Sequence, residues 1–484
     1  MKRVIAIFIS FILLLAAGCQ PSPATLIIST PSPAPIDTPA PSATPVPTVA
    51  PDPTSTPTSE PTSISVMVVG DLLCLGAQLS AAKSGGSYNF DYCFEAVKDT
   101  ISSADLAIGN LETLVADGYK YTSIASSDDS TATPAPSESV APSEPAASEE
   151  PATSEEPSAS KNPVVSEEPS VSDAAGGEES SADTGKTGLS ALAVRPFDKA
   201  PTLETAAPAA TSSSTSSGNP RVNAPESFLT AVLGCGFDVL TNANNHVFDY
   251  KSDGLIKTLN KLDEYKVPHT GAYASSDDKK PLIVDVKGIK LGILAYTDIL
   301  NNKPGKSQAY MVGRYSEKAV TADIKAAREA GADFIIVCIH WGVEHTHKPT
   351  SKQHKMAAFI ANAGADIILG SHPHCTQPFE SIETDHGAVP VLYSMGNFIS
   401  SMGQTIHKDG VIVSMTLEKT ADTGKTAMTS LSYIPTLCAE SSKGRFVIYP
   451  ADLNSIASSP LASRLEASRQ RTIDVLTENV AKAQ

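Results

Sequence analysis

Five short polar clusters follow apolar segments of this 484-residue chain, and each offers side chains that can bind a metal ion. Asp, Glu, Asn and His supply the oxygen and nitrogen ligands that borderline divalent metals accept. One such side chain after a strand is more often a hydrogen-bonded turn residue, but five clusters together favour a site. The clusters are Gly70-Asp71, Gly109-Asn110-Leu111-Glu112, Asn244-Asn245-His246, His340-Trp341-Gly342-Val343-Glu344 and Ser371-His372-Pro373-His374.

The last cluster brings two imidazoles out of one tight turn, because Pro373 restricts the backbone between His372 and His374. A divalent ion held there could lower the pKa of a bound water to about 7 and polarise a phosphoryl or carbonyl oxygen. The residues therefore predict a divalent-metal cofactor, with manganese, zinc and iron as candidates and one or two ions bound.

The segments before the clusters have the composition of buried strands. They are short, rich in Ile and Val, and alternate with amphipathic helices. Strands are predicted at 64–69, 106–108, 237–240, 289–295, 334–339 and 367–369, with further strands at 389–393 and 411–417. Helices are predicted at 251–265, 317–330 and 351–363. This alternation predicts an α/β fold in which helices flank central β-sheets and the polar clusters lie at strand ends.

The amino terminus has the features of an export signal. Lys2 and Arg3 precede an apolar run over 4–17 that is too short to span a bilayer. The run leads into Leu15-Ala16-Ala17-Gly18-Cys19, which resembles a bacterial lipobox, although Leu is more usual where Ala16 stands. We expect residues 1–19 to be a lipoprotein signal peptide and lipidated Cys19 to anchor the chain to the outer, extracytoplasmic face of the bacterial cytoplasmic membrane. A plain secretory signal with a chance Cys is the alternative.

Two low-complexity stretches divide the rest of the chain. Residues 20–62 contain 13 Pro and no aromatic residue, which predicts a Pro/Ser/Thr-rich tether. Residues 122–217 contain 11 Pro, acidic Ser/Pro repeats and Phe197 as the only aromatic residue, too little apolar surface to offset the entropy of ordering. Because candidate site residues lie on both sides, we expect 122–217 to be a disordered insert within one domain over 63–121 and 218–420. A C-terminal strand/helix extension over 421–484 follows, whose last segment is either a helix or a frayed tail.

The predicted insert also holds most of the negative charge. It has 16 acidic and 4 basic residues, which is −12 of the total −17. The remainder lacks the basic surface that nucleic acid requires, so we expect no nucleic-acid partner. The six cysteines after Cys19 form no Cys-x-x-Cys pair, and no disulfide is predicted.

Taken in order, the clusters resemble a known family. The motifs are Gly70-Asp71, Gly-Asn-Leu-Glu at 109–112, Gly236-Phe-Asp-Val with Ala243-Asn-Asn-His246, Ile339-His-Trp-Gly342, Gly370-Ser-His-Pro-His374 and Tyr393-Ser-Met-Gly-Asn-Phe398. Over residues 63–418, apart from the insert, this set resembles the capsule-synthesis CapA family of poly-γ-glutamate biosynthesis, which is similar in fold to calcineurin-like metallophosphoesterases. The resemblance implies a metallophosphoesterase-like layered α/β sandwich, with an anionic polymer such as poly-γ-glutamate or its synthesis machinery as partner.

The resemblance also implies a ligand set. Asp71 matches the first metal-binding Asp of the phosphoesterase pattern, Asn245-His246 its Asn-His motif, His340 its isolated His, and His372 with His374 its closing pair. Leu73 stands where those enzymes have a His, and Asn110 where they have a metal-bridging Asp, so a second ion should bind less tightly unless Glu112 compensates. The expected metal-site residues are Asp71, Asn110, Glu112, Asn245, His246, His372 and His374, and the expected catalytic residues are His340 and Glu344.

Four neighbouring residues have alternative interpretations. His345 and His347 precede Lys348 and Pro349, which favours a solvated loop over metal binding. Trp341 either walls the pocket or packs in the core. Asp249 either orients His246 from behind or caps the helix that follows.

Three functions remain open at this stage. The first is a CapA-like surface lipoprotein that acts in the synthesis, export or anchoring of an anionic capsule polymer. The second is an extracytoplasmic metal-dependent hydrolase of phosphoesters or amides, in which His340 binds metal or donates a proton to the leaving group. The third is a non-catalytic polymer-binding module. The resemblance favours the first as a biological role and leaves open whether that role is catalytic.

Overall fold

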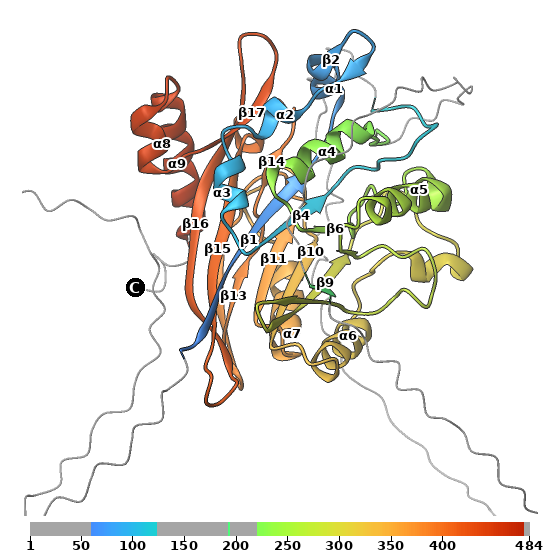
Figure 1. The fold of residues 1–484 in the computed structure, drawn as a ribbon, viewed down its shortest axis with the longest axis vertical. Helices are drawn as coiled ribbons and strands as arrows, with labels where there is room; N and C mark the ends of the chain where they lie inside the picture. The colour runs from blue at the N-terminus through green and yellow to red at the C-terminus, as the bar shows by residue number, and fades with distance from the viewer. Residues whose placement is uncertain (1–59, 123–191, 194–219, 479–484) are drawn as a thin grey trace, which may run out of the picture. The chain divides into compact units, whose positions relative to one another are not determined.

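The computed structural model describes residues 60–122, 192–193 and 220–478 (Figure 1). The predicted signal peptide, the lipidation site Cys19, nearly all of the tether and most of the insert lie outside these residues. The prediction that the insert is disordered is therefore not tested. No helix in the described ranges is long and apolar enough to cross a membrane.

The first sheet has eight strands, and its central strands carry part of the site. The order is β17-β16-β15-β1-β4-β6-β7, and β14 pairs with the end of β1. The bounds are β1 Thr62–Leu72, β4 Leu106–Leu111, β6 Val239–Thr241, β7 His269–Thr270, β14 Asn397–Ile399, β15 Asp409–Lys419, β16 Thr426–Glu440 and β17 Phe446–Pro450. β1, β4, β6 and β7 run parallel, whereas β15, β16 and β17 are antiparallel to their neighbours.

The second sheet has seven strands in the order β12-β13-β11-β10-β9-β8-β5. The bounds are β5 Leu192–Ala193, β8 Leu282–Val286, β9 Ile289–Thr297, β10 Phe334–His340, β11 Ile367–Ser371, β12 Phe379–Thr384 and β13 Gly387–Leu392. Two short strands, β2 Lys83–Ser84 and β3 Ser87–Tyr88, form a separate ribbon. β9, β10, β11 and β13 are parallel, and β8 and β12 pair antiparallel beside them.

The two sheets pack face to face, because alternate residues of the central strands point to opposite sides. In β10, Ile336 and Cys338 join a core that also contains Val66 and Val68 of β1. Ile335, Val337 and Ile339 of β10 instead join a core that includes α6 (Glu317–Glu329) and α7 (Ser351–Asn362). Every residue of β10 is therefore buried, as its continuous apolar sequence predicts.

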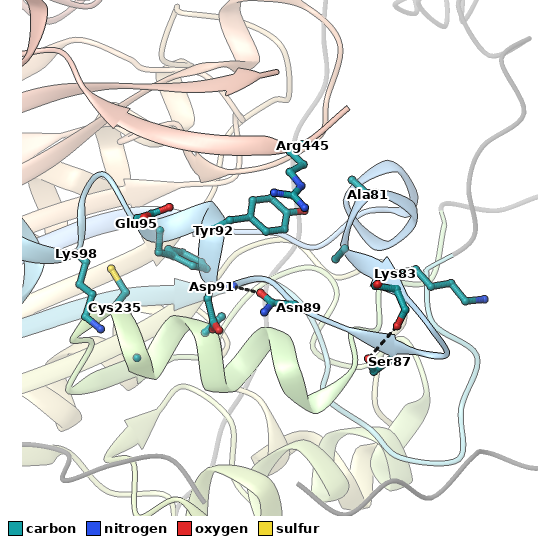
Figure 2. A pocket seen from close by; sticks show the side chains of 15 residues that line it. Ala81, Lys83, Ser87, Asn89, Asp91, Tyr92, Glu95, Lys98, Cys235 and Arg445 are labelled. Atoms are coloured by element: carbon teal, nitrogen blue, oxygen red, sulfur yellow. Dashed lines mark hydrogen bonds between the residues drawn. The ribbon is translucent and has the colours of Figure 1, made fainter. Parts of the chain in front are cut away.

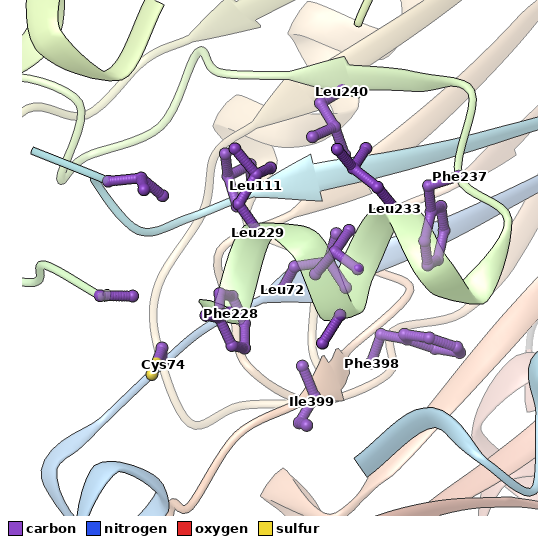
Figure 3. Close-up of a cluster of buried hydrophobic side chains, with 14 of the residues drawn as sticks. Leu72, Cys74, Leu111, Phe228, Leu229, Leu233, Phe237, Leu240, Phe398 and Ile399 are labelled. Carbon is purple, nitrogen blue, oxygen red and sulfur yellow. The ribbon is translucent and has the colours of Figure 1, made fainter. Parts of the chain in front are cut away.

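The outer face of the first sheet is covered by α4 (Glu226–Cys235) and α5 (Lys251–Glu264). Figure 3 shows Leu229 and Leu233 of α4 packed beside Leu111 of β4 and Leu72 of β1. The remaining helices are α1 Gly76–Ala82, α2 Asp91–Phe94, α3 Lys98–Ser102, α8 Leu453–Ser458 and α9 Ala462–Leu476, with 3-10 turns η2 Lys306–Met311 and η3 Thr405–His407. The layered α/β sandwich that the sequence predicts is confirmed.

The two flanks of the long segment that the structure does not describe are adjacent. The backbone N–H of Thr122 donates to the carbonyl oxygen of Asn223 at 2.9 Å, and the N–H of Asn223 donates to Oγ1 of Thr122 at 3.0 Å. An insertion into one domain requires adjacent ends of this kind.

The C-terminal extension is part of the first sheet. β16 pairs with β15 over most of its length, and α8 and α9 lie beside β16 (Figure 1). The last predicted segment is thus a helix through Leu476.

Candidate metal centre

The carboxyl ends of strands from both sheets meet at one place and bring predicted site residues together. Asp71 lies near the end of β1, and His372 follows β11. The backbone N–H of His372 donates to Oδ2 of Asp71 at 3.3 Å, although 301 positions separate the two residues. This contact joins the two sheets at the site.

Asp71 and Glu112 are the buried carboxylates of the site, both 0% exposed. Oδ1 of Asp71 accepts a hydrogen bond from Nδ2 of Asn110 at 2.7 Å. Neither carboxylate oxygen of Glu112 has a hydrogen-bond partner among the described residues. Burial and the nearby charge of Asp71 raise the pKa of Glu112 well above its ordinary value. Because a buried carboxylate without partners is costly unless a cation neutralises it, Glu112 indicates a cation site.

Three imidazoles surround the two carboxylates. Nε2 of His340 lies 3.4 Å from Oε1 of Glu112. Nδ1 of His374 lies 3.8 Å from Oε2 of Glu112 and 3.5 Å from Oδ2 of Asp71. The His372 ring centroid is 4.7 Å from that of His340, and Nδ1 of His372 is buried without a hydrogen-bond partner in the described structure.

These side chains form three overlapping triads whose ligand atoms lie within 4.8 Å of one another. The triads are Glu112-His340-His372, Glu344-His372-His374 and Asp71-Glu112-His374. Glu112, His372 and His374 each belong to two triads, so the three triads describe one connected centre. Its carboxylate oxygens and imidazole nitrogens fit a divalent ion such as manganese, zinc or iron.

The loop that carries His372 and His374 has a constrained backbone. Both residues have positive φ angles, 96° and 57°, a conformation that side chains disfavour and that surrounding contacts must hold. Burial lowers the pKa of His374, but Glu112 and Asp71 outweigh burial and raise it to about 10. Burial and the charge of His374 lower the pKa of His372 to about 4. The pKa values of His374 and His372 shift in opposite directions because the carboxylates of Glu112 and Asp71 lie against His374.

His340 is fixed at both ring nitrogens. Nδ1 lies 2.9 Å from Oγ of Ser371, and Nε2 lies 3.2 Å from Oδ1 of Asn245. Burial, with the charge of nearby His372, holds the pKa of His340 well below its ordinary value. Asn245 therefore contacts His340 directly.

His246 belongs to none of the triads, although its neighbour Asn245 touches the centre. Nδ1 of His246 lies 2.7 Å from Oδ2 of buried Asp249, which also accepts from the N–H of Val222 at 2.9 Å. Helix α5 has Tyr250 as its N-cap residue. Of the two interpretations of Asp249, orientation of His246 agrees with these contacts and helix capping does not.

The segment after β10 contains the other predicted residues. Glu344 joins a triad and is 39% exposed, so it lies at the solvent side of the centre. His345 and His347 belong to no triad, and both are partly exposed, but Nδ1 of His345 lies 2.9 Å from Nε2 of His407. Trp341 is fully buried, donates from Nε1 to the carbonyl oxygen of Tyr393 at 2.8 Å and packs in the core.

Three residues at the site carry no role in the sequence analysis: Ser371, Asn397 and His407. Asn397 lies beside Asp71 because β14 pairs parallel with β1. Gly70 permits this approach, since a Cβ there would lie 2.0 Å from the carbonyl oxygen of Gly396. The motif over 393–398 was the available signal for Asn397, and the cluster at 371–374 for Ser371. His407 stands outside these motifs, so the sequence gives no signal that it belongs to the site.

A cavity of about 820 Å³ lies apart from this centre, and none of the candidate site residues lines it. Figure 2 shows its lining, with the Arg445 guanidinium 4.8 Å from the ring centroid of Tyr92, and Lys83, Lys98 and Asp91 around it. Cavity size therefore does not locate the metal centre, whereas buried unpartnered ligand atoms do.

Comparison with known proteins gives a family match. The family described as "Bacterial capsule synthesis protein PGA_cap" matches residues 65–139 and 200–402, which include every residue of the three triads. The PGA biosynthesis protein CapA of Bacillus subtilis (strain 168) is 30% identical over 246 residues, 49% of this chain and 56% of that protein. The capsule biosynthesis protein CapA of Bacillus anthracis is 31% identical over 210 residues, 40% of this chain and 48% of that protein. The chain thus spans about half the length of these relatives.

Solved structures show only a distant likeness. A phosphatase from Mycoplasma pneumoniae is 11% identical, with 83% of this chain and 98% of that chain covered and a TM-score of 0.35. The calcineurin-like phosphoesterase YfkN from Bacillus subtilis is 17% identical, with 50% and 75% covered and a TM-score of 0.29. TM-scores this low support no conclusion about the chemistry of this chain.

Proposed function

The chain belongs to the PGA_cap family of bacterial capsule synthesis proteins, and from this premise we propose that it acts on an anionic capsule polymer through a divalent-metal centre. Poly-γ-glutamate is the candidate polymer. The role covers its synthesis, export or anchoring, and the reaction at the centre is cleavage of the polymer amide.

The observation that carries the proposal is the buried, unpartnered carboxylate of Glu112 beside the unpartnered Nδ1 of His372. Glu112, His372 and His374, each shared by two triads, would hold the ion. A divalent ion bound there supplies Lewis acidity for a carbonyl oxygen. Glu344, partly exposed beside His372 and His374, is the group that exchanges protons with solvent.

One ion suits this centre better than two. Two-metal sites need a ligand that bridges both ions, commonly a carboxylate. Asn110 instead donates its amide N–H to Oδ1 of Asp71 at 2.7 Å, which occupies an oxygen that a second ion would need. Leu73 is buried and cannot bind metal.

The proposed location rests on the sequence alone. Cys19 carries the lipid anchor, and residues 20–62 hold the domain away from the outer face of the cytoplasmic membrane. At that face the protein meets the polymer outside the cell.

Metal analysis and a hydrolysis assay on the purified full chain test this proposal together. We expect about one divalent ion per chain and metal-dependent shortening of poly-γ-glutamate, with both lost in Glu112→Gln. Glu418→Gln, a substitution on β15, serves as the charge-matched control. Metal-dependent cleavage of a phosphodiester alone would support a phosphoesterase instead. Absence of bound metal and of activity would leave the polymer-binding module.

A further inference from the structure

A groove of about 450 Å³ lies beside the first turn of α7. Its walls are the segment 298–303, residues 342–343 and the first turn of α7, and Arg314 lies in the lining. None of these lining residues belongs to a metal triad.

Two short chain connections link the lining of the groove to candidate site residues. Gly342 and Val343 of the lining stand between His340 and Glu344 in the sequence. On the opposite wall, Leu300 precedes Asn301, whose backbone N–H donates to the carbonyl oxygen of Asn245 at 3.0 Å. A ligand in this groove therefore lies near the segments that carry His340 and Glu344.

The lining carries an excess of positive charge in a chain whose net charge is −17. Lys352 is paired with Asp298, with Nζ 2.6 Å from Oδ2. Lys303 and Arg314 have no hydrogen bond or ion pair from their side chains to any residue that the structure describes. Two cations are therefore available to an anionic ligand.

The rest of the lining is largely apolar and includes Ile299, Leu300 and Met356. Val343 is 54% exposed, and it is one of the two exposed large hydrophobic side chains in the described ranges. A ligand that fits has anionic groups separated by short hydrocarbon segments. A polyamide with pendant carboxylates has this pattern, whereas a polyphosphate lacks the apolar part.

We propose that this groove is the binding subsite for a carboxylate-bearing polyamide, with Lys303 and Arg314 pairing with successive carboxylates of the chain beside the metal centre. The assignment rests on the proposed function for the identity of the polymer. The guanidinium of Arg314 suits bidentate pairing with a carboxylate, and the ammonium of Lys303 adds a second charge-assisted contact.

The test is the binding of a fluorescein-labelled poly-γ-glutamate oligomer to the full chain, followed by fluorescence anisotropy. We expect Lys303→Gln and Arg314→Gln each to weaken binding about tenfold, and the double variant more, because each removes one charge-assisted hydrogen bond. Lys318→Gln with Lys355→Gln, two exposed helix residues outside the groove, gives a control with the same change in net charge. An unlabelled polyphosphate should compete poorly.

The outcomes separate the subsite from the proposed function. If the wild-type protein binds the oligomer and the double variant binds it equally well, the groove proposal is wrong while the function stands. If the wild-type protein does not bind the oligomer, both fail. If polyphosphate competes as well as the polyamide, the groove recognises charge alone and the proposal of a polyamide subsite is overturned. An unchanged melting temperature of the variants excludes loss of folding as the cause.

Discussion

The side chain of Asn397 holds His374 at its Nδ1 atom, with Oδ1 of Asn397 3.0 Å away. Nδ2 of the same amide donates to the carbonyl oxygens of His374 at 3.3 Å and His407 at 3.1 Å. Because an amide oxygen can only accept, this contact requires a proton on Nδ1 of His374 and leaves Nε2 as the nitrogen that can bind a metal ion. Asn397 of β14 thus presets a candidate metal ligand on the loop that follows β11.

Asn397→Ala should lower the affinity for Mn²⁺ by about 10- to 100-fold, the usual cost of losing a group that orients a ligand. Asn397→Asp keeps an oxygen opposite Nδ1 and should retain most of the affinity. Competition with a fluorescent chelator measures both constants. Equal losses in the two variants would show that orientation of His374 is not the role of Asn397.

Glu112→Gln should abolish the stabilisation that metal gives the folded protein. A ligand at about 100 times its dissociation constant stabilises a native state by about 2.7 kcal/mol. Glu112 is buried, and its two carboxylate oxygens are unpartnered in the described structure, so both oxygens are available to bind a cation. Thermal unfolding with Mn²⁺ and with EDTA measures the difference, and Glu418→Gln should keep the full shift. A shift retained in Glu112→Gln would exclude Glu112 as a ligand.

The sequence predicts the fold best where both faces of a strand are buried. Residues 334–339 of β10 point alternately into two cores, so this part of the strand is a continuous apolar run. β16 alternates Ser and Thr with apolar residues and contains Pro435, because much of it is half exposed, and the sequence indicates only an extension there. α4 lacks an amphipathic pattern because it is buried on most sides, although Pro225 and Gly236 mark its ends.

The site could be predicted where residues are adjacent in the sequence. His372 and His374 share one turn, and each polar cluster follows a recognisable strand. Asn397 could not be placed, since its contact with the site depends on the parallel pairing of Asp71 with a strand of three residues. Periodicity does not specify such short pairings, so the positioning residues of this centre emerge only from the structure.

Stability should depend on pH through Asp238. Burial raises its pKa to about 6, although the N–H of Ala107 donates to Oδ2 at 2.8 Å and lowers it. The unfolded pKa is about 3.9, so the folded state binds the proton more tightly and loses stability as the pH rises from about 4 to about 6. Asp238→Asn keeps an acceptor for Ala107 without the charge.

Between pH 4 and pH 7, the free energy of unfolding of Asp238→Asn should rise by about 2 kcal/mol relative to that of the wild type. Urea unfolding at both values measures this gain. Asp285→Asn, which also replaces a carboxylate that accepts a backbone N–H, from Gly288, is the control for the change from carboxylate to amide. If the difference in unfolding free energy between Asp238→Asn and the wild type is the same at pH 4 and pH 7, a raised pKa of Asp238 is contradicted.

Helix α9 is attached to the first sheet through Asp409, whose side chain is 3% exposed. Nε and Nη2 of Arg471 donate to Oδ2 and Oδ1 of Asp409 at 2.7 and 2.8 Å, and Oγ of Ser468 donates to Oδ1 at 2.6 Å. Arg471→Ala would leave the buried carboxylate with Ser468 as its remaining side-chain partner. Loss of one partner of a buried pair costs several kcal/mol, and because Arg471 is 40% exposed, we expect a loss of about 2 kcal/mol.

Arg469→Ala is the matched control, because Arg469 lies on the same helix and its ion pair with Glu466 is 3.9 Å long. It should cost less than about 1 kcal/mol. In the background of Asp409→Asn, the cost of Arg471→Ala should fall by about 1 kcal/mol or more, since the charge that Arg471 neutralises is absent. Urea unfolding of the four chains of this cycle measures the coupling. Equal costs in both backgrounds would mean that Arg471 stabilises α9 by packing and not through Asp409.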